Sequence, residues 1–184
     1  MIYSGLYRVP DQGHFGIRTI LGKRDDHRGL DVIGMTDKHV CAVAAGVVGV
    51  STIITDKANK TWEWGNYVRV DGDDGLKYYY CHLNERYVSV GQRVEEGDHV
   101  GLEGWTGYVL PAGPGGSHCH FEIRDVWGNN MNPALVLGIP NEAGTYGRNY
   151  RAEAQARYGF NDSTMAYLDG HPYAADLYRK LSEK

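Results

Sequence analysis

The sequence predicts a mainly β protein, with one antiparallel β-sheet domain followed by a short helical tail. From about Val40 onward, short β-rich runs alternate with glycine-containing turns, the spacing typical of antiparallel sheets. Near the C-terminus the apolar residues instead recur at helical spacing. We therefore expect a β domain over residues 1–140, and a linker with a helical appendage over residues 141–184.

Each strand is predicted from its own pattern. The expected strands lie, in order, at residues 40–54, 66–71, 76–83, 86–90 and 118–128, with two further glycine-punctuated segments within residues 91–104. Residues 66–71 alternate, so that Val68 and Val70 share one face while polar or amphipathic side chains share the other. The Asp-Gly dipeptides of residues 71–75 favour the positive φ of a tight hairpin turn. These two strands are therefore expected to pair as a hairpin.

The helical predictions concern the C-terminal third of the chain. Residues 130–140 indicate a short helical turn that ends at a proline, and residues 141–150 indicate a linker. Asp162 is expected to cap a helix that ends at Gly170, and Pro172 suits the first turn of the last helix. That helix carries an apolar stripe made by Ala174, Leu177, Tyr178 and Leu181.

The composition excludes several classes of protein. The 184 residues are 42% hydrophobic and 23% charged, as in soluble globular domains, and the net charge of -4 provides no basic field for nucleic acid or anionic lipid. We expect no nucleic-acid partner and no membrane insertion, since no apolar stretch is long enough to span a bilayer and no signal peptide is visible. Cys41, Cys81 and Cys119 are expected to be buried free thiols. The oligomeric state is left open.

Three short segments carry side chains suited to metal chemistry. They contain His27 and Asp31, the single His82, and the pair His118 and His120. On a strand, residues two apart project from the same face, so His118 and His120 converge while Cys119 points into the interior. A hydrolytic zinc site takes three protein ligands and needs a proton acceptor and an oxyanion donor nearby. Five candidates suffice for both tasks, although their spacing alone does not say which histidines bind metal.

The order of motifs along the chain resembles the lysostaphin and LytM family of zinc endopeptidases. The resemblance covers roughly residues 14–140. It is carried by Phe15-Gly16-x-Arg18, His27-x-x-x-Asp31, residues 44–48, 66–71, Tyr80-x-His82-Leu83, residues 90–101, and His118-x-His120 with the following FEIR and NP. It implies an open substrate groove over the central sheet, in a fold of the duplicated-hybrid-motif type.

The same resemblance implies the roles of the five residues. Zn²⁺ would be bound by His27, Asp31 and His120, and His82 and His118 would form the catalytic pair. The implied activity is that of a metallopeptidase, in which zinc-bound water attacks peptide bonds in the stems or cross-bridges of bacterial peptidoglycan. An endolysin of phage type is a reasonable source, acting on the cell wall. In one respect the chain departs from the family, because residues 17–26 lack the tyrosine that members carry upstream of the first ligand.

Substrate contacts are less sharply indicated. Trp62 and Trp64 would line the groove or cover a sheet edge, and Asn66 and Tyr80 lie within matched motifs. Residues 108–116 form a loop long enough to be a groove wall. His14, His39, His99 and His171 lie outside the matched positions and are expected to be structural or exposed. Two alternatives stay open: a non-catalytic relative that binds wall peptides or activates another hydrolase, and a zinc hydrolase of ordinary proteins.

Overall fold

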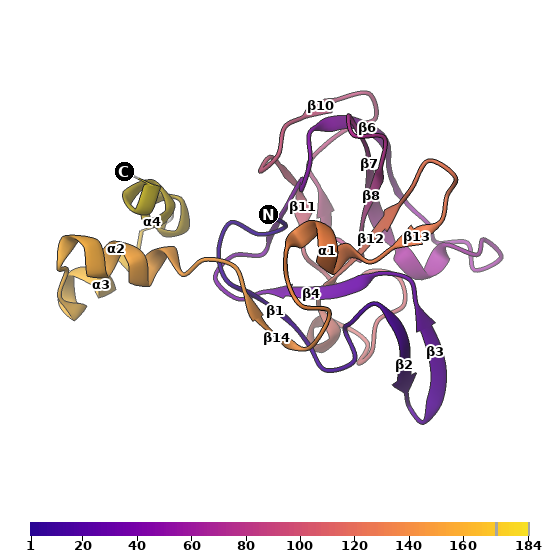
Figure 1. The fold of residues 1–184 in the computed structure, drawn as a ribbon, viewed down its shortest axis with the longest axis horizontal. Coiled ribbons are helices and arrows are strands. Elements are labelled where there is room, and N and C mark those ends of the chain that lie inside the picture. Colours follow the sequence, from indigo (N-terminus) through magenta and orange to yellow (C-terminus); the bar gives the residue numbers. More distant parts are fainter. Residues whose placement is uncertain (172, 184) are drawn as a thin grey trace.

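The predicted antiparallel β domain is confirmed by the computed structural model, which describes residues 1–171 and 173–183. Its main sheet has the strand order β10-β6-β7-β8-β12-β4-β1-β14, with β13 paired to β12. These strands are β1 (Tyr7–Val9), β4 (Leu30–Gly34), β6 (Gly46–Ile53), β7 (Asn66–Gly72), β8 (Lys77–Cys81), β10 (Arg93–Val94), β12 (Cys119–Arg124), β13 (Asn130–Met131) and β14 (Gly144–Tyr146). Figure 1 shows β4 and β12 in the middle of the domain.

Two smaller sheets flank the main one. One has the order β5-β11-β9, and the other is the hairpin β2-β3, which projects from the domain in Figure 1. Their strands are β2 (Gly16–Ile20), β3 (Lys23–His27), β5 (His39–Cys41), β9 (Glu85–Arg86) and β11 (His99–Leu102). The helices are α1 (Pro133–Leu137), α2 (Tyr150–Tyr158), α3 (Asp162–Asp169) and α4 (Ala174–Glu183), with 3-10 turns η1 (Trp62–Trp64) and η2 (Pro114–Gly116).

The predicted hairpin forms between β7 and β8, with its turn at the Asp-Gly segment. Asp71 pairs with Lys77 beside the turn, and Val68 and Val70 are fully buried while the alternate side chains are not. These valines join Tyr78 and Phe121 in the core of the β domain. The three cysteines are buried and free, as expected. Cys119 is on the core side of β12, so its neighbours His118 and His120 are left on the other side.

Three predictions about the β domain were wrong. Strands begin well before Val40: β1 to β3 were missed, and β2 and β3 lack apolar alternation because their hairpin is largely exposed. Of residues 86–90 only Arg86 belongs to a strand, although the amide of Tyr87 still donates to the carbonyl oxygen of Val100. The expected linker at residues 141–150 contains β14, which pairs with β1 and extends the main sheet. The tilted contact between the rings of Tyr7 and Tyr146 holds this edge strand in place.

The helical tail is confirmed, but its details differ from the prediction. Helix α2 was missed because its sequence is strongly polar, and Asn149 caps it through the amide of Ala152. Asn161, not Asp162, caps α3, because its side chain accepts from the amide of Thr164. Pro172 lies outside the described residues. No helix in the described part of the chain combines the length and apolar character needed to cross a membrane.

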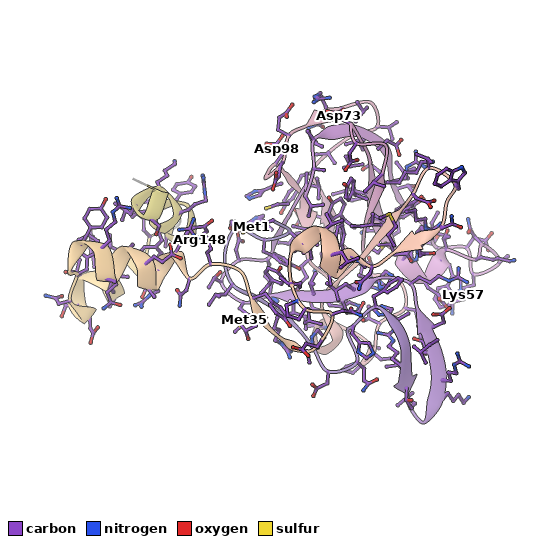
Figure 2. All side chains as sticks on the ribbon, viewed as in Figure 1. Met1, Met35, Lys57, Asp73, Asp98 and Arg148 are labelled. Atoms are coloured by element: carbon purple, nitrogen blue, oxygen red, sulfur yellow. The ribbon has the colours of Figure 1, made fainter. Side chains whose placement is uncertain are left out.

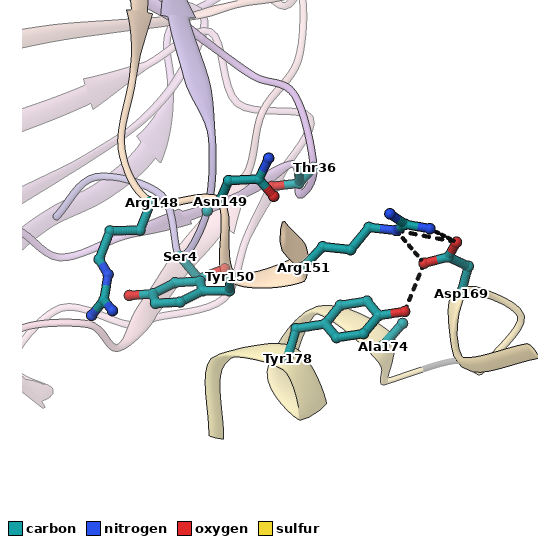
Figure 3. A pocket seen from close by; sticks show the side chains of 10 residues that line it. Ser4, Thr36, Arg148, Asn149, Tyr150, Arg151, Asp169, Ala174 and Tyr178 are labelled. Atoms are coloured by element: carbon teal, nitrogen blue, oxygen red, sulfur yellow. Dashed lines mark hydrogen bonds and ion pairs between the residues drawn. The ribbon is translucent and has the colours of Figure 1, made fainter. Parts of the chain in front are cut away.

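Helices α2, α3 and α4 have a hydrophobic core of their own. It is formed by the buried side chains of Tyr150, Ala154, Met165 and Tyr178 and is separate from the core of the β domain. In Figure 1 helices α2, α3 and α4 stand beside the β domain and are joined to it by the segment after β14; Arg148, labelled in Figure 2, lies at this junction. A cavity of about 230 Å³ opens there, and Figure 3 shows Arg151 and Tyr178 binding Asp169 on its helical side. None of its lining residues belongs to the histidine cluster described next.

Candidate metal centre

The pairing of β12 with its neighbours brings two of the predicted ligands together. His120 lies directly opposite Asp31 of β4, and antiparallel partners project from the same face of a sheet. His27 is the last residue of β3, and the turn to β4 passes close over β12. Gly29 makes this approach possible, because a Cβ at that position would lie 2.6 Å from the carbonyl oxygen of Phe121 and 2.8 Å from the His120 ring.

Three ligand atoms of these residues form a compact triangle. Nε2 of His27 is 3.0 Å from Nδ1 of His120 and 3.2 Å from Oδ1 of Asp31. Nδ1 of His120 and Oδ1 of Asp31 are 2.8 Å apart. Ligand atoms about 2.0–2.1 Å from a tetrahedral zinc ion are separated by a little over 3 Å, so atoms at this spacing can share one ion. Two imidazoles with one carboxylate also match the ligand chemistry of catalytic zinc sites.

The atoms that face away from the triangle are already bonded. Nδ1 of His27 donates to the carbonyl oxygen of His14 at 2.7 Å, which leaves Nε2 with its lone pair toward the triangle. Arg18 donates from Nη1 to Oδ2 of Asp31 at 2.9 Å, so Oδ1 is the oxygen that faces inward. Nε2 of His120 lies 3.2 Å from Oε1 of the buried Glu122. Such outer hydrogen bonds orient metal ligands and set their tautomers.

The electrostatics of the cluster favour a bound cation. Burial alone would raise the pKa of Asp31, but the neighbouring His118, His120 and His27 hold it well below its usual range. Burial would lower the pKa of His120, whereas its hydrogen bonds to Asp31 and Glu122 raise that pKa to about 9. The carboxylates of Asp31 and Glu122 therefore favour positive charge at the His120 imidazole. A divalent ion would supply that charge directly.

His82 and His118 lie beside the triangle and share one arrangement. Nδ1 of His82 donates to the carbonyl oxygen of Thr106 at 2.9 Å, and Nδ1 of His118 donates to that of Gly116 at 2.7 Å. In both rings Nε2 is thereby left as an acceptor. The ring centroids are 4.7 Å apart, and Nε2 of His118 lies 3.5 Å from Oδ1 of Asp31. The structure thus gathers all five predicted side chains into one cluster.

The environment of His82 is unusual in two respects. Its burial, reinforced by His118 and His120, lowers its pKa to about 3, so the ring is neutral near pH 7. Its φ of 62° places a residue with a side chain in the left-handed region. The amide of His82 donates to the carbonyl oxygen of Trp64 at 2.9 Å, which helps to hold this conformation. Backbone strain of this kind is concentrated at functional sites.

The aromatic residues expected at the substrate lie in different surroundings. The ring of Trp62 meets that of Tyr108 at 5.9 Å, and the amide of Tyr108 donates to the Glu63 carbonyl oxygen, which joins η1 to the loop that ends at His118. Trp64 instead packs on the sheet, with its ring centroid 5.4 Å from that of Tyr79. Trp62 therefore contacts the loop of residues 108–116, whereas Trp64 contacts the sheet.

Asn66 and Tyr80 differ from what was expected at the substrate. The Asn66 side chain donates to the carbonyl oxygen of Asn84, so its amide nitrogen already serves the fold. Tyr80 as a substrate contact is wrong. Its ring is fully buried against Phe121, and its hydroxyl accepts from the amide of Val43. Alternation explains the error, because Tyr80 is one residue away from the face that carries Cys81 and His120.

Two side chains that contact the candidate ligands received no role from the sequence. Arg18 and Glu122 lie in matched motifs, but neither was connected with a ligand. For Glu122 a signal existed, because residues 120 and 122 of a strand share a face. For Arg18 no comparable signal exists, since its contact with Asp31 depends on how the hairpin β2-β3 returns to β4. The carbonyl groups of His14, Thr106 and Gly116 could not be predicted as histidine partners either, because these contacts also depend on the fold.

Comparison with known protein families assigns the chain to one of them. The profile of peptidase family M23 matches residues 25–133, more than half of the chain, and includes all five residues of the cluster. This chain belongs to peptidase family M23. The M23 chain is 31% identical over 120 residues to the peptidoglycan DD-endopeptidase ShyC of Vibrio cholerae, a match that covers 65% of the chain and 25% of that relative. It therefore spans about a quarter of ShyC.

Solved structures of the lysostaphin type share the fold. The catalytic domain of the prophage-encoded M23 protein EnpA from Enterococcus faecalis, in a mutant form, superposes with a TM-score of 0.55 at 25% identity, over 72% of the M23 chain and 92% of that domain. The catalytic domain of the antimicrobial peptidase lysostaphin from Staphylococcus simulans superposes with a TM-score of 0.52 at 23% identity, over 68% and 89% of the two chains. The expected resemblance to the lysostaphin and LytM family is confirmed.

Proposed function

We propose that this M23 chain is a zinc-dependent endopeptidase that hydrolyses peptide bonds in the stems or cross-bridges of bacterial peptidoglycan, at the cell wall. One observation carries the proposal: Nε2 of His27, Oδ1 of Asp31 and Nδ1 of His120 face one another within 3.2 Å. Membership of family M23 and the name of ShyC support the peptidase activity and the substrate class. The non-catalytic alternative has no feature of the cluster in its favour, since all five positions are filled.

His27, Asp31 and His120 would hold the ion. When bound, zinc supplies a Lewis acid that polarises the scissile carbonyl and lowers the pKa of a water molecule toward neutrality. The charge of one aspartate does not cancel that of the ion, so the centre stays positive. Arg18 and Glu122 keep the ligands oriented through the hydrogen bonds described above.

His82 and His118 would move the protons. Each offers a free Nε2, because Nδ1 of each ring donates to a backbone carbonyl. A neutral imidazole at this position accepts a proton from the attacking water. Once protonated, its Nε2–H donates to the developing oxyanion and then to the leaving amine. The buried position of His82 keeps its ring neutral and ready to accept.

Purified cell walls provide the direct test of activity. We expect the protein to clear a suspension of these walls. Clearance should stop when a chelator removes zinc and resume when zinc is restored. Elemental analysis should find one zinc ion per chain. Pentaglycine and cross-linked muropeptides should be cleaved in preference to casein. Zinc binding without any cleavage would favour the non-catalytic alternative, and a preference for casein would overturn the substrate class.

The domain boundary also needs a revised proposal. Because β14 pairs with β1, we propose that the catalytic domain extends to Gly147 and that residues 148–184 form the helical appendage. The separate core of the helices supports this division, and so small a core suits an appendage rather than an independent domain.

Truncation after Gly147 should leave the β domain folded and able to bind zinc, because its core is intact. The matched control ends after residue 143 and also removes β14. That loss unpairs β1 and exposes Tyr7, so the melting temperature should fall by about 5–10 °C relative to the longer truncation. Circular dichroism measures the folding and the melting temperature of both truncated proteins. Unfolding of the longer truncation would show that the helices stabilise the catalytic domain.

A further inference from the structure

Beyond His120, a second row of interactions follows the same face of β12. Glu122, two residues further along, is only 2% exposed and has both carboxylate oxygens occupied. Oε1 faces Nε2 of His120 at 3.2 Å, whereas Oε2 accepts from Arg124 and from the side chain of Asn130. Arg124 binds Oε2 with both Nε, at 3.1 Å, and Nη2, at 2.7 Å. This division leaves Oε1 free for the histidine.

Arg124 is itself held by aromatic rings. Its guanidinium carbon lies 5.2 Å from the ring centroid of Trp64 and 4.8 Å from that of Tyr79. Guanidinium groups at such distances are attracted to the faces of indole and phenol rings. Trp64 is fixed in turn by the edge of Tyr67, whose ring centroid is 5.2 Å away. The aromatic residues thus hold a cation that donates twice to Glu122, the carboxylate beside His120.

From these contacts we infer that Trp64, Arg124 and Glu122 form a positioning relay that sets the orientation of His120 and thereby the affinity of the site for zinc. The inference rests on the proposed zinc ligation. It gives Trp64 a role different from the substrate contact expected at first. Trp62, only two residues away in η1, contacts Tyr108 and Lys57 and takes no part in the relay.

The physical reason is that His120 must present Nδ1, not Nε2, to the ion. An imidazole can rotate about its side-chain bonds and can carry its proton on either nitrogen. Glu122 fixes both choices by accepting from Nε2–H, and a carboxylate acceptor also makes the opposite nitrogen a stronger ligand. Arg124 prevents Glu122 from turning away, because a guanidinium binds with two N–H groups in a fixed plane.

The test is the zinc affinity of the full chain, measured by competition with a chromogenic chelator and with no peptide substrate present. Glu122→Gln keeps the shape but loses the charge, and should weaken zinc binding on the order of 10- to 100-fold. Arg124→Lys keeps the charge but loses the planar fork, and should weaken it about tenfold. Trp64→Leu should weaken it about threefold, whereas the matched control Trp62→Leu should leave it within about twofold.

An affinity of Glu122→Gln within about twofold of the unaltered protein would overturn the relay. Should that variant fail to fold, Arg124→Lys decides by the same criterion. Equal losses in Trp64→Leu and Trp62→Leu would remove the aromatic residues from the relay. In the zinc-loaded protein, ¹⁵N shifts of His120 should report a proton on Nε2 hydrogen-bonded to a carboxylate, and the Nε2 shift should change in Glu122→Gln. A chain that binds zinc through the relay yet cleaves no wall peptide would refute the proposed function and leave this inference standing.

Discussion

His120→Ala should lose zinc and peptidase activity together. His120 occupies the central strand β12, and its Nδ1 lies within 3.0 Å of a ligand atom from both His27 and Asp31. Removing it leaves two protein ligands, and we expect zinc affinity to fall on the order of 10³-fold, since several ligands share the binding free energy of such a site. Activity should fall below detection, because the remaining groups lack the Lewis acid.

Inductively coupled plasma analysis of the dialysed protein, paired with wall clearance, measures both effects. His99→Ala is the matched control: His99 is exposed on β11 and stacks on His39, away from the cluster. It should keep one zinc ion per chain and full activity. If His120→Ala at micromolar concentration still retains one zinc ion per chain, His120 is not a zinc ligand. The protein should stay folded in either case, because the core side of β12 is unchanged.

The parts of the fold that the sequence predicted are those with a local signal. Residues 66–81 combine alternation with Asp-Gly turn residues, and the hairpin β7-β8 follows both. The hairpin β2-β3 has no such signal, because β3 is charged on both faces and no residue of β2 is buried. Its position matters for the site nonetheless, since β3 ends at His27. Edge strand β14 was missed because it has only three residues. So short a strand can pair with an existing sheet without showing an alternating hydrophobic pattern.

The candidate site was predictable in its side chains and not in its hydrogen bonds. Residue type and the i, i+2 rule place His118 and His120 on one face, and the resemblance to a known family joins them to the distant segments. The partners that fix the tautomers are mostly backbone carbonyls, such as those of His14 and Thr106, and any residue offers the same group. Only the fold selects which carbonyl lies within reach. The roles of His82 and His118 were therefore implied by resemblance, and their free Nε2 atoms emerge from the structure.

His82→Ala and His118→Ala should keep zinc but lose turnover. Neither ring belongs to the ligand triangle, so zinc affinity should change by no more than a few-fold. Each offers Nε2 for proton transfer, a contribution worth about 10²- to 10⁴-fold in kcat. Because His82 has a positive φ, His82→Asn is the better variant of that residue, since asparagine tolerates the left-handed region. Zinc content and kcat on a defined muropeptide, measured for each variant, separate binding from catalysis.

The two histidines should also act as a unit. Their ring centroids are 4.7 Å apart and both serve the same proton, so the double variant should lose little more activity than either single one. Additive losses would mean two independent functions. The sharper risk concerns His118, whose Nε2 lies 3.5 Å from the inward oxygen of Asp31. If His118→Ala abolishes zinc binding while His120→Ala retains it, the assignment is reversed. His118 would then be the zinc ligand that shares the ion with Asp31, and His120 would take the catalytic role.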